Sequence, residues 1–340
     1  MHRLLIVTVN YRTAELTEKC LRSIANDRAR LPESTRMVVV DNDSGDGSFD
    51  RIKAYIEDNG WDDWAEVVQA DCNGGFSYGN NYAIRPALQS DAPPDYIWLL
   101  NPDAESLEGA GKALIDFLEA HPRAGLATSR YVDPNDEPKA MAFRHFTVLS
   151  EFVSNLRLGL LERLLPRGVV YIAPQPEPYQ ADWLSGTSLM IRREVFDDVG
   201  LMDEGYFLYF EESDFCLQAQ RKGWELWYVP ESRILHVIGA STGFRHSSER
   251  EPRRPRYWFE SRRRYFVKNF GPAYAMLADA AHMTGFALWQ LRRAIQRKPN
   301  LDPPHYLGDF LANSTFVKGF ALESQRRCPD HSGLTTQATD

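Results

Sequence analysis

The first hundred residues alternate between short apolar runs and segments whose apolar residues recur at helical spacing. Runs of strand length occupy 4–9, 37–40, 65–70 and 96–100, and helical spacing covers 15–26, 49–57 and 78–88. A further helix is predicted near 110–120 and a strand near 125–129, and regular structure resumes at 183–191 and 193–199. Strands and helices that alternate at this spacing favour an α/β fold with a mostly parallel, doubly wound central sheet flanked by helices.

The run 96–100 is uninterrupted and ends at Asn101, Pro102 and Asp103. An unbroken apolar run is typical of a central strand, and the proline should stop it. Asp103 would then lie at the carboxyl edge of the sheet, where open α/β folds bind ligands. A carboxylate there suits Mg²⁺ or Mn²⁺ held on phosphate oxygens, although an Asx-type turn would need the same residues.

Two further loops follow predicted strands. Asp41, Asn42 and Ser44 come after 37–40, where a carboxylate or amide could accept a hydrogen bond from a pyrimidine base; ordinary turn chemistry is the alternative. The segment 73–81 holds three glycines and opens a helix. Glycine permits close backbone approach to a ligand, and a helix N-terminus attracts phosphate. The spacing is not that of the dinucleotide fingerprint.

An acidic cluster, Glu211, Glu212 and Asp214, follows an aromatic run and precedes a helical pattern. Burial and mutual repulsion would raise a carboxylate pKa and give a general base, whereas a solvated acidic helix start is the alternative. His236, near the end of another predicted strand, could share a metal site with Asp103 or be an ordinary core histidine. Trp183 is either a sugar-stacking platform or a packed aromatic residue.

Composition limits the function classes. The chain has 340 residues and a formal net charge of −8, which argues against a nucleic-acid partner. Four widely spaced cysteines are expected to be reduced thiols of a cytoplasmic protein, and the early core strand leaves no room for a signal peptide. The segment 273–298 fits either an interfacial amphipathic helix, peripheral on the inner membrane, or a helix packed on the domain; it could also mediate a homodimer.

Taken in order, these motifs resemble the family 2 glycosyltransferases, and within them the rhamnosyltransferase-like branch, over about 4–271. The resemblance rests on 9–11, 40–48, 73–81, 99–103, 183–186, 210–216 and His236. It implies a GT-A fold and a metal-dependent, inverting transfer of a sugar from a nucleoside-diphosphate sugar to a hydroxyl acceptor, with no covalent intermediate.

The resemblance also implies roles for single residues. Asp103 and His236 would hold Mg²⁺ or Mn²⁺, and Glu212 would be the acceptor-activating base, with Glu211 and Asp214 as rivals because the usual Glu-Asp-x-Asp pattern is altered here. The nucleotide would be bound by Thr8, Asn10, Asp41, Asn73, Gly75, Asn80, Asn81 and Asn101. Trp183, Gly186 and Arg144 would meet the acceptor, and Arg256, Arg262 and Arg263 are further candidates to meet phosphate or an anionic acceptor.

The expected organisation is a nucleotide-sugar half (1–132), an acceptor and base half of the same domain (133–271), a C-terminal helical extension (272–327) and a disordered tail (328–340). The donor expected from the resemblance is dTDP-rhamnose, with UDP-galactofuranose or a UDP-hexose as alternatives, and the acceptor is a glycan or lipid-linked glycan of the cell surface. A non-catalytic nucleotide-sugar-binding protein is the rival interpretation.

Overall fold

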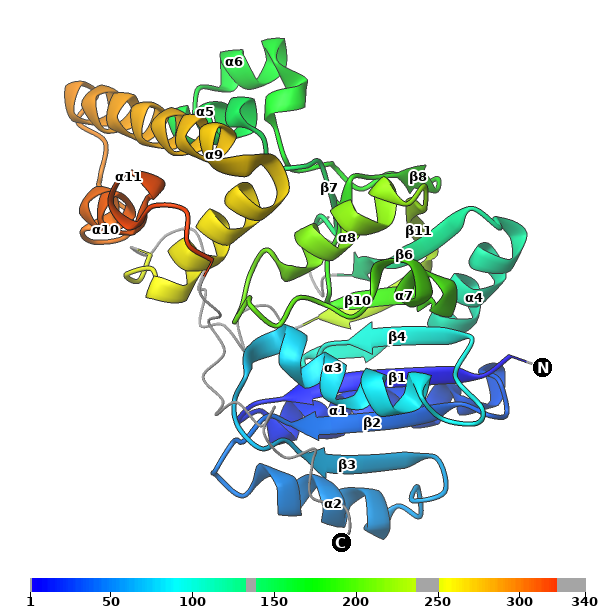
Figure 1. The fold of residues 1–340 in the computed structure, drawn as a ribbon. Coiled ribbons are helices and arrows are strands. Elements are labelled where there is room, and N and C mark those ends of the chain that lie inside the picture. Colours follow the sequence, from blue (N-terminus) through cyan, green and yellow to red (C-terminus); the bar gives the residue numbers. More distant parts are fainter. Residues whose placement is uncertain (1, 133–138, 237–250, 323–340) are drawn as a thin grey trace, which may run out of the picture.

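The computed structural model describes residues 2–132, 139–236 and 251–322, and the side chain of His236 lies outside the described part. A single large sheet organises the chain, in the order β3-β2-β1-β4-β10-β6-β11-β5, with β8 paired to β11 (Figure 1). Its strands are β1 (Leu4–Asn10), β2 (Arg36–Asp41), β3 (Ala65–Gln69), β4 (Tyr96–Leu100), β5 (Ala104–Ser106), β6 (Ala124–Val132), β8 (Tyr179–Gln180), β10 (Ser188–Arg192) and β11 (Glu225–His236). A small second sheet pairs β7 (Ala142–Phe143) with β9 (Trp183–Leu184).

The pairing confirms the mostly parallel sheet. Strands β3, β2, β1 and β4 run parallel to one another, and β11 runs parallel to β6. Strand β10 lies antiparallel between β4 and β6, and the short β5 lies antiparallel to β11. Because β10 and β11 come from the second half of the chain, the two expected halves share one sheet.

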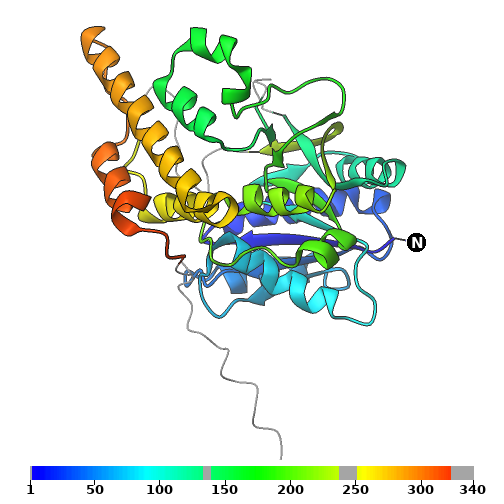
Figure 2. The ribbon, with the colours of Figure 1, turned by 45° about the horizontal axis from the view of Figure 1, so that its top comes forward.

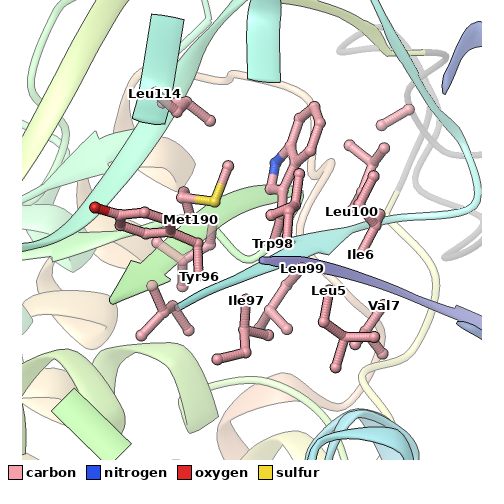
Figure 3. Packing of buried hydrophobic residues seen from close by; sticks show 14 of the residues in the cluster. Leu5, Ile6, Val7, Tyr96, Ile97, Trp98, Leu99, Leu100, Leu114 and Met190 are labelled. Atoms are coloured by element: carbon pink, nitrogen blue, oxygen red, sulfur yellow. The ribbon is translucent and has the colours of Figure 1, made fainter. Parts of the chain in front are cut away.

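Strand β4 lies at the centre of the core, as its unbroken apolar sequence predicts. All five of its residues are buried. Tyr96 and Trp98 point to the face that carries Leu114 of α4 (Ala110–Ala120), and Ile97 points to the opposite face (Figure 3). Because this strand is packed on both faces, all of its side chains are apolar, which explains why apolar and polar residues do not alternate along it.

Helices cover both faces. Thr8 of β1 lies 3.9 Å from the Cys20 sulfur of α1 (Ala14–Asp27), whereas a Cβ on Gly79 of α3 (Gly75–Leu88) would touch Val9, the next residue of the same strand. Successive strand residues face opposite ways, so α1 and α3 lie on opposite faces. The remaining helices beside the sheet are α2 (Ser48–Asp58), α7 (Arg193–Val199) and α8 (Glu211–Arg221).

A helical region stands beyond the sheet (Figure 2). It contains α5 (Val148–Leu156), α6 (Gly159–Leu164), α9 (Arg256–Ile295), α10 (Tyr306–Asn313) and α11 (Thr315–Lys318). The backbone of α9 leaves helical geometry at Gly271, where the expected extension begins. Helices α5 and α6 do not form one continuous helix, because Arg157 takes a left-handed conformation between them.

Cys20 and Cys216 are buried free thiols. Cys72 is disulfide-bonded, so the expectation of a reduced thiol is wrong for this residue. Cys328 and the predicted tail 328–340 lie outside the described residues. Within the described ranges, no helix has the length and hydrophobicity needed to span a bilayer.

Candidate active site

The carboxyl ends of β1 and β2 are joined by a buried polar network. Asn10 donates from Nδ2 to Asp41 Oδ1 at 2.6 Å, and the Ser44 hydroxyl donates to the same oxygen at 2.5 Å. The other oxygen of Asp41 accepts from the Ser44 backbone N–H at 3.1 Å and from Gln69 Nε2 at 3.0 Å. A carboxylate has about four acceptor sites, so this one is already satisfied by the protein. Asp41 therefore shapes the loop.

The neighbouring Asn42 has acceptor capacity that Asp41 lacks. Its Nδ2 donates to Asn73 Oδ1 and to the Gly75 carbonyl, both at 3.1 Å. Its Oδ1 is buried and finds no hydrogen-bond partner among the described residues. A buried polar atom without a partner is unusual and is often explained by a ligand. Asn42 stands in the loop that the sequence singled out, although it was not among the predicted nucleotide ligands.

Helix α3 begins against the chain that precedes α8. Gly75 has φ +86°, and a Cβ there would lie 1.9 Å from the Phe207 carbonyl oxygen, which accepts from Phe76 N–H at 3.0 Å. This glycine is thus required for contact with protein backbone, whereas the sequence suggested close approach to a ligand. Asn80 and Asn81 are buried and bonded to the Phe76 carbonyl and to residues 202–204, respectively. Thr8 packs between sheet and α1, so a nucleotide role for these residues stays a prediction.

The turn after β4 places the predicted metal ligand. The Asn101 backbone carbonyl accepts from Ala104 N–H at 3.0 Å, which closes the turn, and Asp103 inside it is 4% exposed. Strand β5 follows at once and pairs with β11, with Ala104 opposite His236. The three-residue β5, which the sequence did not predict, therefore brings the two predicted metal ligands to adjacent strands.

The donor chemistry at this edge fits a hard divalent ion. Mg²⁺ and Mn²⁺ sites commonly use one or two protein ligands, with water and phosphate oxygens completing the shell. Among described side chains, no cluster of three or more His, Cys, Asp or Glu residues forms a closed metal site. Asp103 would supply that small protein share, together with His236, whose backbone pairs with the residue after Asp103.

The acidic cluster begins α8, and its three carboxylates have different surroundings. Asp214 accepts from Lys268 Nζ and from Asn269 Nδ2, both at 2.6 Å, so it is ion-paired to α9. Glu211 is 2% exposed, and its Oε2 finds no hydrogen-bond partner among described residues. Glu212 is half-buried, and its Oε1 accepts from the Gly186 backbone N–H at 3.3 Å. Of the three, Glu212 is the one that is partly accessible and has no cationic partner among the described residues.

The two glutamates also differ in pKa. Burial, and then the charge of Glu212, raises the pKa of Glu211 well above its usual range. Burial also raises the pKa of Glu212, but backbone N–H groups that include Gly186 oppose the shift. Because two buried neighbours resist carrying charge together, the protein favours a protonated Glu211 beside an ionised Glu212.

The backbone just before this helix is strained and is held by packing. Tyr209 and Phe210, which precede Glu211, have φ of 71° and 69°. Consecutive non-glycine residues in the left-handed region cost about 1–3 kcal/mol each and are found mainly at functional sites. Phe210 is fixed by the rings of Phe146 and Tyr265, at centroid distances of 4.9 and 5.6 Å.

A short chain of contacts joins the base candidate to the metal candidate. Glu212 is bonded to Gly186, and a Cβ on Gly186 would lie only 2.9 Å from Glu212 Oε1. The next residue, Thr187, accepts from Asn101 N–H at 3.0 Å, in the turn that holds Asp103. The structure thereby brings the segments 101–103, 186–187 and 211–212 together.

Two predicted acceptor residues serve the local fold. Trp183 stacks on Phe143 at a centroid distance of 4.1 Å and donates from Nε1 to the Arg144 carbonyl at 2.9 Å. The Arg144 guanidinium donates to the backbone carbonyls of Val169 and Tyr171. These contacts fit the packed interpretation of Trp183, and acceptor binding by either residue stays a prediction.

The suggestion that Arg262 meets phosphate is wrong. This residue is 2% exposed and is ion-paired with two buried carboxylates, Glu151 at 2.9 Å and Asp279. Arg263 donates to the carbonyls of Gly319 and Ala321, and Arg256 pairs with Glu260. Arg262 and Arg263 thus connect α9 to other segments, whereas the Arg256 pair lies within α9.

Comparison with known proteins finds matches in sequence. A sequence model of the family described as Glycosyl transferase family 2 matches residues 4–200. Rhamnosyltransferase WbbL of Escherichia coli K12 is 29% identical over 164 residues, which are 48% of this chain and 60% of that protein. The N-acetylglucosaminyl-diphospho-decaprenol L-rhamnosyltransferase of Mycobacterium tuberculosis is 29% identical over 247 residues, 70% of this chain and 77% of that protein.

Two solved structures share the fold. The Pyrobaculum calidifontis mannosyltransferase PcManGT, in complex with GDP-Man and Mn²⁺, superposes with a TM-score of 0.54 at 16% identity, covering 94% of this chain and 84% of its own. Staphylococcus aureus TarS in complex with UDP-GlcNAc has a TM-score of 0.53 at 14% identity, covering 92% and 79%. The GT-A architecture expected from the sequence is therefore confirmed.

Proposed function

The chain belongs to glycosyl transferase family 2, and we propose that it transfers a sugar from a nucleoside-diphosphate sugar to a hydroxyl group of a glycan acceptor. The observation that carries this proposal is the meeting of three segments at the carboxyl edge of the sheet: the Asp103 turn, the Gly186 loop and the start of α8. A direct displacement at a sugar carbon needs one carboxylate on the side of the diphosphate and a separate carboxylate that can act as a base. Asp103 and Glu212 would fill these two roles at one edge of the sheet.

Glu212 acts as the general base in this proposal. It takes the proton of the acceptor hydroxyl as that oxygen attacks the anomeric carbon from the face opposite the diphosphate. One displacement forms the new glycosidic bond and breaks the bond to the diphosphate, so the anomeric configuration inverts. The Gly186 N–H holds one oxygen of Glu212, which orients the carboxylate before the acceptor arrives.

Asp103 and His236 would hold Mg²⁺ or Mn²⁺, which supplies positive charge for the leaving diphosphate. Asn42 Oδ1 is placed to accept a hydrogen bond from the N3–H of a uracil or thymine base, since it lacks another partner among the described residues. Asn10 and Asp41 then act by fixing the loop that presents Asn42.

The donor we propose is dTDP-rhamnose. The names of the relatives from Escherichia coli and Mycobacterium tuberculosis support rhamnose, and the second name supports a lipid-linked diphosphate-sugar acceptor. Thymine and uracil offer the same N3–H, so the site itself does not separate dTDP from UDP donors.

A donor panel tests the proposal. Wild-type protein is incubated with dTDP-rhamnose, UDP-galactofuranose or UDP-hexoses, with Mg²⁺ or Mn²⁺ and an N-acetylglucosaminyl-diphospho-lipid acceptor, and nucleoside diphosphate release is measured. Release that needs acceptor and metal, fastest with dTDP-rhamnose, is expected. Tight binding of a nucleotide sugar without release from any donor would favour the non-catalytic binding protein.

A further inference from the structure

The outward face of α9 beyond the Gly271 break is apolar. Between residues 273 and 295, each exposed position holds an apolar residue or Thr284. The largest of them, Leu277, Leu288, Leu291 and Ile295, recur at spacings that keep them on one side of a helix. Leu291 is 60% exposed and Ile295 is 74% exposed. From Leu277 to Ile295 this stripe is about 27 Å long.

The polar residues of the same helix face inward. Asp279 and His282 are 1% and 4% exposed, and they bond to Arg262, Thr315, Glu151 and Tyr306. Asp279 and His282 therefore lie on the buried side of this helix. A helix that buries an aspartate and a histidine and exposes leucine reverses the usual pattern of a surface helix, so a partner should cover the exposed side.

A second element extends this face. Helix α6 exposes Leu160 and Leu164 by 66% and 67%. It follows Leu156 and Arg157, whose carbonyls accept from Arg292 Nη2 of α9 at 2.9 and 2.5 Å. Figures 1 and 2 both show α6 and the end of α9 on the side of the molecule away from the sheet.

We propose that this face, formed by α6 and residues 273–298, docks on the surface of an anionic lipid bilayer. The argument for that partner is charge. The face and the residues that adjoin it carry seven basic residues, Arg157, Arg163, Arg167, Arg292, Arg293, Arg297 and Lys298. Of the nearby acidic residues, Glu151, Asp279 and Asp302 are buried, the last of them ion-paired with Arg157, and only Glu162 and Glu177 are more accessible. Exposed leucines with basic residues beside them suit the surface of a bilayer, where acyl chains lie below anionic head groups.

A second copy of the chain fits this face less well. In a two-fold dimer the same patch would meet itself, so the exposed basic residues of one copy would face those of the other with few accessible carboxylates between them. A bilayer supplies the missing negative charge. The inference goes beyond the proposed transfer reaction, because it concerns where the protein sits and not which donor it uses.

Vesicle flotation of the full-length protein tests the docking. Vesicles of phosphatidylglycerol mixed with phosphatidylcholine are compared with pure phosphatidylcholine, at low and high salt. We expect binding to the anionic vesicles, weakened by salt. The double variant Leu291→Glu/Ile295→Glu should lose about tenfold or more in partitioning. The variant Arg297→Gln/Lys298→Gln should lose about fivefold per charge removed at low salt.

A control places one such glutamate on another exposed apolar residue. Val317 of α11 is 60% exposed, and Val317→Glu should bind vesicles as wild type does. Circular dichroism should show all variants folded, and nucleoside diphosphate release with a short-chain, soluble acceptor should be unchanged in Leu291→Glu/Ile295→Glu. That readout separates loss of docking from a failure of the proposed reaction.

Three results would overturn the proposal. Wild-type protein that does not float with anionic vesicles is one. Equal flotation of Leu291→Glu/Ile295→Glu and wild type is the second. The third is a stable wild-type dimer in light scattering that Leu291→Glu/Ile295→Glu converts to monomer, which would assign the face to a second copy.

Discussion

Replacing Glu212 by glutamine separates chemistry from binding at the proposed site. The amide is nearly isosteric with the carboxylate, and its oxygen can keep the 3.3 Å hydrogen bond from Gly186 N–H. Donor binding and folding should therefore be retained, whereas proton removal from the acceptor is lost. General-base catalysis contributes about 10²–10⁴-fold, so kcat should fall by that factor, or about 3–5 kcal/mol in the barrier.

The adjacent glutamate supplies the matched control. Glu211→Gln changes the same chemical group one residue earlier, but Glu211 is buried and its pKa is already raised by burial and by Glu212. Because the wild-type side chain is favoured in its protonated form, the amide should keep activity. A raised folded-state pKa costs stability once the pH exceeds the unfolded pKa, so Glu211→Gln should be more stable than wild type at neutral pH, and this advantage should vanish in acid.

The assay is steady-state release of nucleoside diphosphate, with donor affinity from calorimetry and stability from urea unfolding. The wild-type rate should increase with pH as Glu212 ionises, with a midpoint above the ordinary glutamate pKa because burial raises it. Wild-type turnover by Glu212→Gln, together with loss of turnover by Glu211→Gln, would refute the reasoning and move the base to Glu211.

Four other changes extend the test. Asp103→Ala should abolish metal-stimulated turnover while urea unfolding stays cooperative, and full activity would remove the assigned metal site. Asn42→Ala should raise the donor KM about 2–10-fold with kcat unchanged, as expected for the lost hydrogen bond to the base, and it should also lower stability because the Nδ2 bonds to Asn73 and Gly75 are lost. Gly75→Ala would put a Cβ 1.9 Å from the Phe207 carbonyl at φ +86°, so the free energy of unfolding in urea should fall by about 2–4 kcal/mol. Arg262→Met should lower it by about 3–5 kcal/mol, because two buried carboxylates lose their cation.

Strong periodicity made the central sheet predictable. The five apolar residues of β4 and the helical spacing of α4 and α7 are strong local signals, and the structure reproduces these elements at the predicted bounds. The strand β5 has three residues, too few for any pattern, and it exists because β11 returns to pair with it. That pairing depends on residues about 130 positions apart, which local sequence does not encode.

Side-chain partners were the least predictable part of the site. The sequence predicted that Asp41 and Asn73 follow strands and that Glu212 begins a helix, but it did not show that Asp41 is saturated by Asn10, Ser44 and Gln69. Arg262 looked available for phosphate, whereas its burial beside Glu151 and Asp279 decided its role. The sequence also did not show which side of α9 is buried. Only the packing of α9 against α5 and α10 reveals that Asp279 and His282 face inward.

The most direct test of the account is a crystal structure of the protein grown with Mn²⁺ and the preferred nucleotide sugar, with the ion located by its anomalous scattering. The account predicts an Mn²⁺ peak bound by Asp103 and the donor diphosphate, with the Glu212 carboxylate on the opposite side of the anomeric carbon. A donor bound elsewhere, or a Glu212 side chain that faces no part of the bound sugar, would contradict it.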